Sequence, residues 1–475
     1  MPHAKSIVFF HPDLGIGGAE RLVIDAAVGL QSLGHKVTIY TSYRDVNHCF
    51  DEARDDAVSE GTLNVRVRGN SIFPASVFGR FKILFAILRH YHLLLSITLS
   101  GQLRRLKPDA FFVDQLSAGI PLMRHFYPTT RIIFYCHFPD FLLVQQRKSL
   151  AKRIWRLPFD WMEGWSMRGA DRVVVNSKFT KGIVEGVWSE LGGKRGLGVI
   201  YPCVDAGERE RNTQGKKEEN SKRRSWAGKK VALSINRFER KKDVGLAIKA
   251  FAGLKKDERA AARLVIAGGY DNREQENVSY HQELETLADD LGLRRATTKN
   301  IVTALSIPED IEVLFLPSVA AQLKTTLLEH AQLLVYTPSN EHFGIVPLEA
   351  MLACTPVLAA NTGGPTETVV NEETGWLRPV DDVKAWTEVM RQALFTLDYS
   401  KWEKMGLAGQ QRVSREFSKT KMAHRLNDEI EVMVAAPRVA TKELQDLLLD
   451  LGVFGVVVIA VMAVTSRWWG SVVPM

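Results

Sequence analysis

The sequence predicts an α/β protein of two Rossmann-like, doubly wound domains that face a cleft, with a C-terminal membrane-associated helix. Three observations support this fold class. Short apolar runs alternate with amphipathic helical segments through most of the 475 residues. The alternation stops once, in a polar stretch at 203–230, and then resumes. An uncharged apolar stretch, Leu451 to Ser466, lies near the C-terminus.

The first half begins with a strand predicted at Ile7–Phe10, a helix at Ala19–Leu33 that ends at Gly34, and a strand at Lys36–Thr41. This order is a βαβ unit, which predicts a parallel sheet. Later apolar runs predict strands at Ala110–Val113, Arg131–Cys136, Arg172–Asn176 and Gly198–Tyr201. We therefore expect an N-terminal domain at 1–202, on the acceptor side of the cleft.

A second α/β series follows the polar linker at 203–230. The predicted strands are Val231–Ile235, Arg263–Ala267, Glu312–Leu316, Leu333–Thr337 and Pro356–Ala360. The predicted helices are Val244–Leu254, Tyr280–Leu291 and Ile345–Cys354. We expect a donor-binding domain at 231–395, helices at 396–436 that pack back on the core, and a membrane-anchor tail at 437–475. Ligands of such sheets bind at the carboxyl ends of the strands.

Charge and cysteine content bound the partners and the compartment. The net charge of +8 favours an anionic partner such as a phosphate or an anionic lipid. The four cysteines are widely spaced, without metal or redox spacing, which indicates reduced thiols in the cytosol. The first strand begins within a few residues of the N-terminus, and no secretory signal precedes it.

Two glutamates eight residues apart, Glu341 and Glu349, form the most informative motif. Glu341 is expected just after a buried strand and Glu349 about two turns along the next helix. Their carboxylates can then be roughly 10–12 Å apart, which suits the two hydroxyl-bearing ends of one nucleotide-sugar and not an acid/base pair. Complementation of a helix dipole is the alternative for Glu341 alone. The Gly363-Gly364-Pro365 turn after the next strand favours a binding site.

A glycine-rich loop, "HPDLGIGGAERL", follows the first strand. Gly17 and Gly18 permit close backbone approach, and the helix that follows offers free N–H groups to a phosphate. A dinucleotide-binding loop would have a third glycine where Glu20 stands, and an acidic residue at the end of the second strand, where Asp45 lies too far along. NAD is therefore disfavoured. A simple tight turn is the alternative.

Two further segments place polar residues after predicted strands. "SINRFERKKD" offers Arg237 and Lys242, a fork donor and a point charge that together suit a diphosphate. "FYCHFPDFLL" offers His137, which can bind a sugar hydroxyl or transfer a proton. A solvated charge run and a structural histidine are the respective alternatives.

Taken in order, these motifs resemble the retaining glycosyltransferases of family 4, which have the GT-B architecture. The resemblance covers roughly residues 5–435. Within that family, "YCHFPD", "INRFERKKD" and "EHFGIVPLEAM" are similar to the α-1,3/1,6-mannosyltransferases of the dolichol-linked oligosaccharide pathway. The resemblance implies that GDP-mannose is a co-substrate, without a further cofactor or a required metal. It implies dolichyl-diphosphate-linked Man1GlcNAc2 and Man2GlcNAc2 as acceptors, on the cytosolic face of the endoplasmic reticulum membrane. Membrane lipid and neighbouring enzymes of the pathway are the other expected partners, and nucleic acid is not.

The resemblance also implies residue roles. Gly17 and Gly18 approach the donor diphosphate, and Arg237 and Lys242 neutralise it. Glu349 holds the ribose, Glu341 the mannose, and His137 lies near the reacting carbon. The remaining expected donor contacts are Gly268, Gly269, Phe343, Gly344 and Ile345. Without a placed carboxylate nucleophile, retention favours front-face substitution, in which the leaving phosphate accepts the acceptor's proton. Residues 293–319 are irregular, so the base-recognition residues stay open.

Membrane contact is predicted at three places. Leu451 to Ser466 spans about 24 Å as a helix, so a transmembrane span and a surface-lying anchor both stay open. Arg467, Trp468 and Trp469 fit an interfacial belt. The segment 78–99 carries Lys82, Arg89, His92 and Ser96 on one face, which favours an interfacial helix over a core helix. Basic residues among tryptophans suit an anionic lipid surface: Arg147, Lys148, Lys152, Arg153 and Arg156. Acceptor entry along the N-terminal domain is our hypothesis.

Three alternatives remain at this level. The first is another retaining family 4 glycosyltransferase with a different lipid acceptor, for example of the phosphatidylinositol type. The second is a nucleotide-sugar epimerase with the same two-domain fold, which would not need a membrane anchor. The third is a non-catalytic, membrane-tethered nucleotide-sugar-binding protein.

Overall fold

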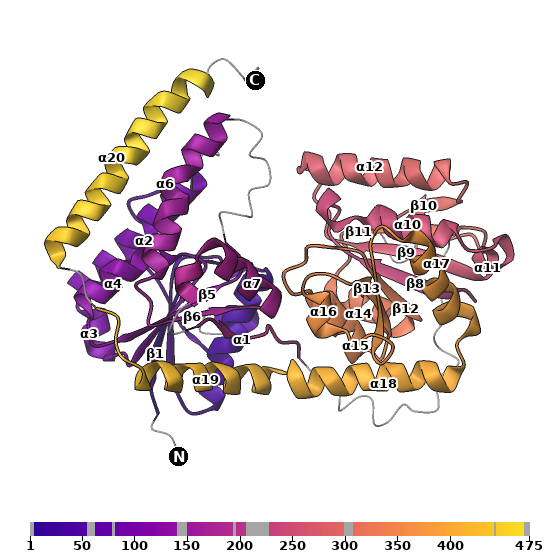
Figure 1. The fold of residues 1–475 in the computed structure, drawn as a ribbon, viewed down its shortest axis with the longest axis horizontal. Coiled ribbons are helices and arrows are strands. Elements are labelled where there is room, and N and C mark those ends of the chain that lie inside the picture. The colour runs from indigo at the N-terminus through magenta and orange to yellow at the C-terminus, as the bar shows by residue number, and fades with distance from the viewer. Residues whose placement is uncertain are drawn as a thin grey trace. The chain divides into compact units, whose positions relative to one another are not determined.

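The computed structural model describes residues 4–54, 62–77, 81–139, 150–192, 196–205, 228–298, 307–440 and 443–469. The chain forms two compact units: unit 1 holds residues 1–201 and 422–475, and unit 2 holds residues 202–421. Each unit contains one seven-stranded sheet with helices around it (Figure 1). Most of the predicted linker (206–227) lies outside the described residues, as do Arg147 and Lys148 and the side chains of Lys152, Arg467, Trp468 and Trp469.

The sheet of unit 1 is parallel throughout, in the order β3-β2-β1-β4-β5-β6-β7. Its strands are β1 (Ser6–Leu14), β2 (Lys36–Arg44), β3 (Asn64–Val67), β4 (Ala110–Asp114), β5 (Arg131–Cys136), β6 (Arg172–Val175) and β7 (Gly198–Val199). The strand order reverses at β1, which lies between β2 and β4. Such a reversal opens a crevice at the carboxyl ends of the strands, where ligands of α/β sheets bind.

The helices of unit 1 come from both parts of the chain. They are α1 (Gly18–Ser32), α2 (Lys82–Leu99), α3 (Gln102–Leu106), α4 (Ile120–Phe126), α6 (Leu150–Met167), α7 (Lys178–Val187), α19 (Lys419–Ala435) and α20 (Leu444–Trp469), with short 3-10 turns η1 (Asp51–Ala53), η2 (Ser117–Gly119) and η3 (Ser189–Gly192). The C-terminal part is joined to the sheet by polar contacts. Arg172 at the start of β6 pairs with Glu429 of α19 at 2.5 Å.

The sheet of unit 2 is also parallel, in the order β10-β11-β9-β8-β12-β13-β14. Its strands are β8 (Lys230–Ile235), β9 (Ala262–Gly268), β10 (Arg295–Thr297), β11 (Val313–Pro317), β12 (Leu333–Tyr336), β13 (Val357–Ala360) and β14 (Gly375–Arg378). Its helices are η4 (Arg240–Lys242), α10 (Val244–Ala252), α11 (Lys256–Ala261), α12 (Gln275–Asp290), α14 (Ala321–His330), α15 (Ile345–Leu352), α16 (Pro365–Thr368), α17 (Val383–Arg391), the π-helical η5 (Gln392–Thr396) and α18 (Tyr399–Glu416). Here the order reverses at β8, between β9 and β12.

These sheets confirm the predicted α/β class and every predicted strand. Three strands were not predicted: β3, β10 and β14. All three are outer strands, three or four residues long, and their sequences "NVRV", "RAT" and "GWLR" lack a continuous apolar run. An outer strand is buried less completely than a central one, so its sequence carries a weaker signal.

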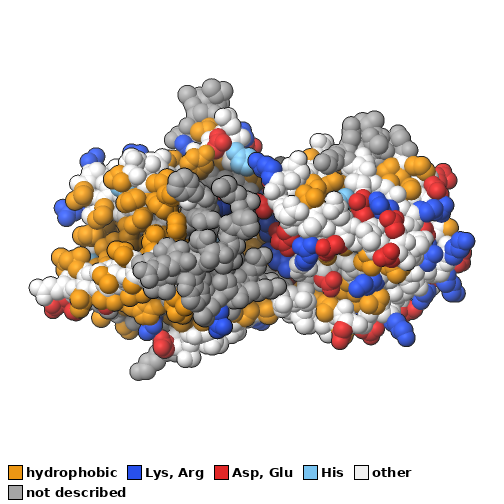
Figure 2. All heavy atoms as spheres, turned by 90° about the horizontal axis from the view of Figure 1, so that it is seen from above, with side chains coloured by type: hydrophobic (Ala, Val, Ile, Leu, Met, Phe, Trp, Pro, Cys, Tyr) orange, Lys and Arg blue, Asp and Glu red, His pale blue; other side chains and the backbone are white. Residues whose placement is uncertain are grey.

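Within the part of the chain that the structure describes, two helices are long and apolar enough to cross a membrane by length and composition, Lys82–Leu99 and Leu444–Met462. One face of α20 packs on unit 1, because Leu447, Phe454 and Val458 are buried. The ring of Phe454 meets that of Phe159 in α6, with centroids 5.8 Å apart, and α20 lies along α6 (Figure 1). The other face of α20 is exposed and aliphatic, with Val456 68% exposed. Figure 2 shows hydrophobic side chains gathered on this side of unit 1.

The structure alters the prediction for α2. This helix buries Leu93, Leu94 and Ile97 in the core of unit 1. Arg89, expected on the polar face of an interfacial helix, is buried and donates to Asp13 near the end of β1, at 2.7 Å. The core alternative therefore holds for one face of α2. Leu99 at its end is 85% exposed.

Candidate active site

Glu341 lies in the loop that follows β12, as predicted, and unit 2 surrounds it with donors. The Lys242 ammonium lies 2.5 Å from Glu341 Oε2, and the Tyr336 hydroxyl donates to the same oxygen at 2.8 Å. Thr337 Oγ1 donates to the carbonyl of Lys242 at 2.7 Å, which ties the lysine's backbone to the end of β12. The loop after β8 and the loop after β12 thus meet at one carboxylate, where the strand order of the sheet reverses.

The charges of this cluster are set by burial and by each other. Burial alone would raise the pKa of Glu341, but the Lys242 ammonium and the Tyr336 hydroxyl outweigh it and lower that pKa. Burial raises the pKa of Tyr336 well above its usual range, and the negative charge of Glu341 raises it further. Glu341 is therefore an ionised acceptor at neutral pH, and Tyr336 is a protonated donor.

Glycines hold the Glu341 loop in place. The Gly364 N–H donates to the Glu341 carbonyl at 2.7 Å. A Cβ on Gly364 would lie 2.3 Å from the Cα of Phe343, so no larger residue fits there without a backbone shift. Gly344 has φ +87, a left-handed conformation that favours glycine, and directly precedes α15 at Ile345. The predicted Gly363-Gly364-Pro365 turn is therefore the support of the Glu341 loop.

Glu349 lies on α15, about one turn beyond its start at Ile345, and accepts from Lys324 of α14 at 2.6 Å. Lys324 was not predicted as a site residue. Phe343 is buried against Phe417, with ring centroids 5.8 Å apart, so its side chain belongs to the core and only its backbone supports the loop.

Arg237 differs from the expected arrangement with Lys242. Its side chain is 64% exposed and pairs with Glu239 at 3.1 Å, whereas Lys242 pairs with Glu341. Gly268, at the end of β9, has φ +150, and a Cβ there would lie 1.9 Å from the carbonyl oxygen of Asn236. A Cβ on Gly269 would lie 3.1 Å from Arg237 Cγ. These glycines let the loop that carries Arg237 approach β9 closely.

In unit 1, the glycine loop ends β1 and begins α1, as predicted. Gly17 is extended at the N-cap of α1, without a side-chain cap, and its carbonyl accepts from Arg21. The first N–H groups of the helix have no partner within it, which is the arrangement that favours a bound anion. A Cβ on Gly18 would meet nothing within 4 Å, so this glycine borders open space.

His137 follows β5, as predicted, and the structure adds two residues to it. Its Nε2 lies 2.6 Å from Oδ1 of Asp114 at the end of β4, and Nδ1 of His11 in β1 lies 2.7 Å from the other oxygen. Asp114 and His11 are fully buried. His11 Nε2 is buried without a hydrogen-bond partner among the described residues. Neither residue was predicted, although each is a polar residue at the end of an apolar strand, which is the signal that identified His137.

The environment of Asp114 keeps it charged. Burial would raise its pKa, but His137 and His11 together outweigh burial and lower it. A buried carboxylate between two imidazoles fixes the orientation of both rings. Asp114 thus aims the exposed edge of His137, in the way that a buried carboxylate orients the base in other enzymes.

A cavity of about 560 Å³ opens beside His137. Its polar wall includes His137, Asp13 and Gln115, and its apolar wall comes from the first turns of α2 and from α6. Gln115 follows Asp114 and has φ +60, a left-handed conformation that is uncommon for a residue with a side chain. Such backbone strain is often found at functional sites.

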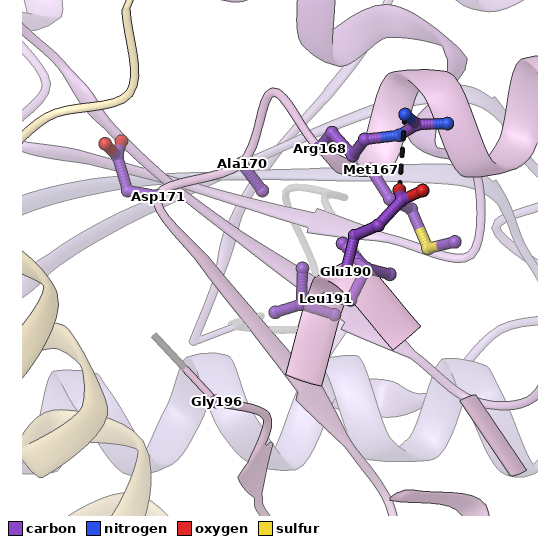
Figure 3. Close-up of a pocket in the computed structure, with 8 residues that line it drawn as sticks. Met167, Arg168, Ala170, Asp171, Glu190, Leu191 and Gly196 are labelled. Carbon is purple, nitrogen blue, oxygen red and sulfur yellow. Dashed lines mark ion pairs between the residues drawn. The ribbon is translucent and has the colours of Figure 1, made fainter. Parts of the chain in front are cut away.

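A smaller cavity of about 280 Å³ lies elsewhere in unit 1 (Figure 3). None of the predicted site residues lines it. Its charged groups are engaged: Arg168 pairs with Glu190 at 3.2 Å, and Asp171 accepts from Arg124 and from the N–H of Ile132. This cavity is therefore bordered by structural ion pairs.

No group of three histidine, cysteine, aspartate or glutamate side chains that could hold a metal ion occurs within the described ranges. The cluster around Glu341 instead presents cations and hydroxyl donors. That the protein requires no metal stays a prediction.

The chain matches two family models. Residues 16–207 match "Glycosyltransferase Family 4", and residues 216–412 match "Glycosyl transferases group 1". Among solved structures, a sucrose-phosphate synthase from Thermosynechococcus elongatus superposes with a TM-score of 0.65 at 18% identity, covering 91% of this chain and 99% of that one. These matches and the two parallel sheets define a glycosyltransferase of the GT-B architecture.

The curated relatives narrow the class. The α-1,3/1,6-mannosyltransferase alg-2 of Neurospora crassa is 58% identical over 90% of this chain and 91% of its own length. The α-1,3/1,6-mannosyltransferase ALG2 of Debaryomyces hansenii is 46% identical over 89% of each chain. The chain belongs to the ALG2 family of α-1,3/1,6-mannosyltransferases, which confirms the predicted resemblance.

Proposed function

We propose that this protein transfers mannose from GDP-mannose to dolichyl-diphosphate-linked Man1GlcNAc2 and then Man2GlcNAc2, through α-1,3 and α-1,6 linkages, in the assembly of the N-glycan precursor. The observation that carries the proposal is the 58% identity with an α-1,3/1,6-mannosyltransferase over nine-tenths of both chains. The epimerase and the non-catalytic binding protein are not favoured by any match.

The proposed donor groups lie mainly in unit 2. Glu341 is an ionised acceptor held by two donors, which suits hydrogen bonds from the hydroxyls of a mannose. Glu349 would accept from the ribose hydroxyls. Lys242 and the exposed Arg237 would neutralise the charge that develops on the leaving diphosphate, and the open N-terminus of α1 at Gly18 would add backbone donors.

Substrate binding would redistribute the Lys242 charge. The Lys242 ammonium pairs with Glu341. A diphosphate brought near Lys242 would compete for that ammonium, while hydroxyl groups of the sugar would take its place as donors to Glu341. The ion pair thus holds both side chains in position before the donor arrives, which lowers the ordering cost of binding.

His137 is proposed to act on the acceptor side. Its ring is held by Asp114 through Nε2. The ring nitrogen that remains for the substrate is therefore Nδ1. In a front-face substitution the leaving phosphate oxygen accepts the acceptor's proton, and the role of His137 is to position hydroxyl groups near the reacting carbon.

We also propose that the protein works on the cytosolic face of the endoplasmic reticulum membrane. The exposed aliphatic face of α20 and the exposed end of α2 support contact with lipid, and the acceptor itself is membrane-bound. Because the opposite face of α20 packs on α6, a helix lying in one leaflet fits the packing better than an independent span.

The test uses the full chain purified in detergent, with GDP-mannose and dolichyl-diphosphate-linked Man1GlcNAc2, and follows products by mass spectrometry. We expect a product two hexoses heavier, and no product with UDP-glucose as donor. Glu341→Ala should abolish transfer while the protein still unfolds cooperatively. If the wild-type protein adds no mannose from GDP-mannose, or if Glu341→Ala keeps wild-type turnover, the proposal is wrong in its function or in its site, respectively.

A further inference from the structure

We propose that the cavity between α2 and α6 binds the phosphate-proximal part of the lipid acceptor, with the diphosphate at Lys82 and the first isoprene units along the apolar wall. This inference rests on the proposed function and assigns the acceptor a place in unit 1. The volume of the cavity, about 560 Å³, falls in the range of ligand pockets, roughly 300–1,000 Å³.

The cavity wall is amphipathic. One wall is apolar and is built by Ile83, Ala86 and Ile87 of α2 and by Phe159 and Met162 of α6. The other is polar and contains His137 and Gln115. A ligand that fills this space must combine apolar with polar groups, which fits a lipid that bears phosphate and sugar.

The apolar wall of the cavity continues to helix α20. Ile87, Phe159 and Met162 belong to the same buried cluster as Phe454 and Val458 of α20. The side of α20 turned away from that cluster is exposed and aliphatic. Apolar side chains thus extend from the exposed aliphatic face of α20, through this buried cluster, to the cavity beside His137.

The charges of the cavity identify Lys82 as the phosphate contact. The wall holds two acids and two bases besides His137: Asp13, Glu163, Lys82 and Arg156. Asp13 is paired with the buried Arg89 at 2.7 Å, and Arg156 is paired with Asp160 at 3.2 Å. Lys82 is exposed at the first turn of α2 and has no ion-pair partner among the described residues. A diphosphate supplies the anion that this lysine lacks.

The helix that carries Lys82 is held firmly. The ion pair between the buried Arg89 and the partly exposed Asp13 joins α2 to the end of β1, and Leu93, Leu94 and Ile97 anchor the later turns of α2 in the core. Lys82 and Ala86 are one turn apart on the same face of the helix, so the charge and the apolar wall have a fixed spacing. The cavity is therefore formed before the acceptor binds.

The experiment compares two acceptors with the same Man1GlcNAc2 glycan, one linked to phytanyl diphosphate and the other an octyl glycoside without phosphate. Lys82→Ala should lower kcat/KM about tenfold or more on the diphosphate acceptor, because a charge-assisted contact is lost. The same variant should change kcat/KM on the octyl glycoside less than about threefold. Arg104→Ala, an exposed arginine of α3, is the charge-matched control and should match the wild type on both.

A second variant tests the apolar wall. Ala86→Trp places an indole in the volume assigned to the lipid, so the KM for the phytanyl acceptor should rise about tenfold while the KM for GDP-mannose stays unchanged. Leu95→Trp, at an exposed position of the same helix, is the steric control and should leave both KM values unchanged. Thermal unfolding checks that all four variants fold.

The outcomes separate the two proposals. Wild-type protein that transfers mannose to neither acceptor overturns the proposed function. Active wild-type protein whose Lys82→Ala variant loses equally on both acceptors, or behaves as wild type on both, overturns the cavity assignment alone. An Ala86→Trp variant with an unchanged KM for the phytanyl acceptor does the same.

Discussion

At the scale of single residues, the pairing of Lys242 with Glu341 separates two neighbouring lysines of the same loop. Lys242 is partly buried and pairs with Glu341, whereas Lys241 is about half exposed and pairs with Glu239 at 3.0 Å. Removal of Lys242 takes away the cation that pairs with a largely buried carboxylate, to which the Tyr336 hydroxyl still donates. The two lysines therefore form a natural matched pair for mutation.

We expect Lys242→Ala to lower kcat/KM for GDP-mannose about 10²–10³-fold, since a cation that stabilises the leaving group and orients Glu341 is lost. Lys241→Ala should change kcat/KM less than about threefold, because its ion pair is exposed. Steady-state transfer assays measure both. Equal losses in the two variants would contradict the special role of Lys242.

The buried carboxylate of Asp114 makes a prediction about stability and pH. Its folded pKa is lowered below the ordinary value of 3.8, so its ionised form stabilises the folded state above that pH and the stabilisation is lost as pH falls through the folded pKa. Asp114→Asn should therefore cost about 1–3 kcal/mol near pH 5 and less near pH 3. Urea unfolding at the two pH values measures the difference. A cost that does not shrink in acid would contradict the prediction.

Some of these site residues could be predicted from the sequence and others could not. Glu341 and His137 could be located because each follows an apolar strand directly. His11 and Asp114 carry the same signal, but their contacts with each other and with His137 could not be predicted, because the sheet order brings together residues 103 and 23 positions apart. The contact of Tyr336 with Glu341 depends on the course of one loop. The motif also suggested that Arg237 acts beside Lys242; in the fold Arg237 pairs with Glu239, whereas Lys242 pairs with Glu341.

At the scale of secondary-structure elements, the turn after β13 controls the loop after β12. Gly364 donates to the Glu341 carbonyl, and its missing Cβ makes room for the backbone of Phe343. The central strands of both sheets could be predicted, because their buried residues form continuous apolar runs. The packing of one turn on another could not, since it depends on which strands are neighbours.

We expect Gly364→Ala to lower the free energy of unfolding by about 1–3 kcal/mol, because the methyl group would have to displace backbone. Transfer activity should fall as well, since the Glu341 loop would move. Gly182→Ala in α7 is the control, because a Cβ there meets nothing within 4 Å, and it should stabilise the protein by about 0.5–1 kcal/mol. Thermal unfolding measures both, and an unchanged Gly364→Ala protein would refute the support by this turn.

At the scale of the whole molecule, the C-terminal helix belongs to unit 1 and packs on α6. From its sequence alone, α20 could be a span or a surface helix, because hydropathy cannot show that one face packs on α6. Both faces of α20 are apolar. One face is buried against unit 1, and the other is exposed and aliphatic.

We expect Phe454→Ala to destabilise unit 1 by about 3–5 kcal/mol, since a buried aromatic ring that meets Phe159 is removed. Val456→Ala, on the exposed face, should change stability by less than about 0.5 kcal/mol. Urea unfolding in detergent distinguishes the two. If both variants were equally stable, α20 would not contribute to the packing of unit 1.

The division of unit 1 between the two ends of the chain has a consequence for biosynthesis. Residues 1–201 leave the ribosome first, but α19 and α20, which complete their packing, follow only after all of unit 2 has been made. Until then the apolar surface of α6 around Phe159 has no helix to cover it, so the nascent chain would need a chaperone or early contact with lipid. Unit 2, continuous from 202 to 421, can fold as soon as it has been made, whereas unit 1 can be completed only after α19 and α20 have followed.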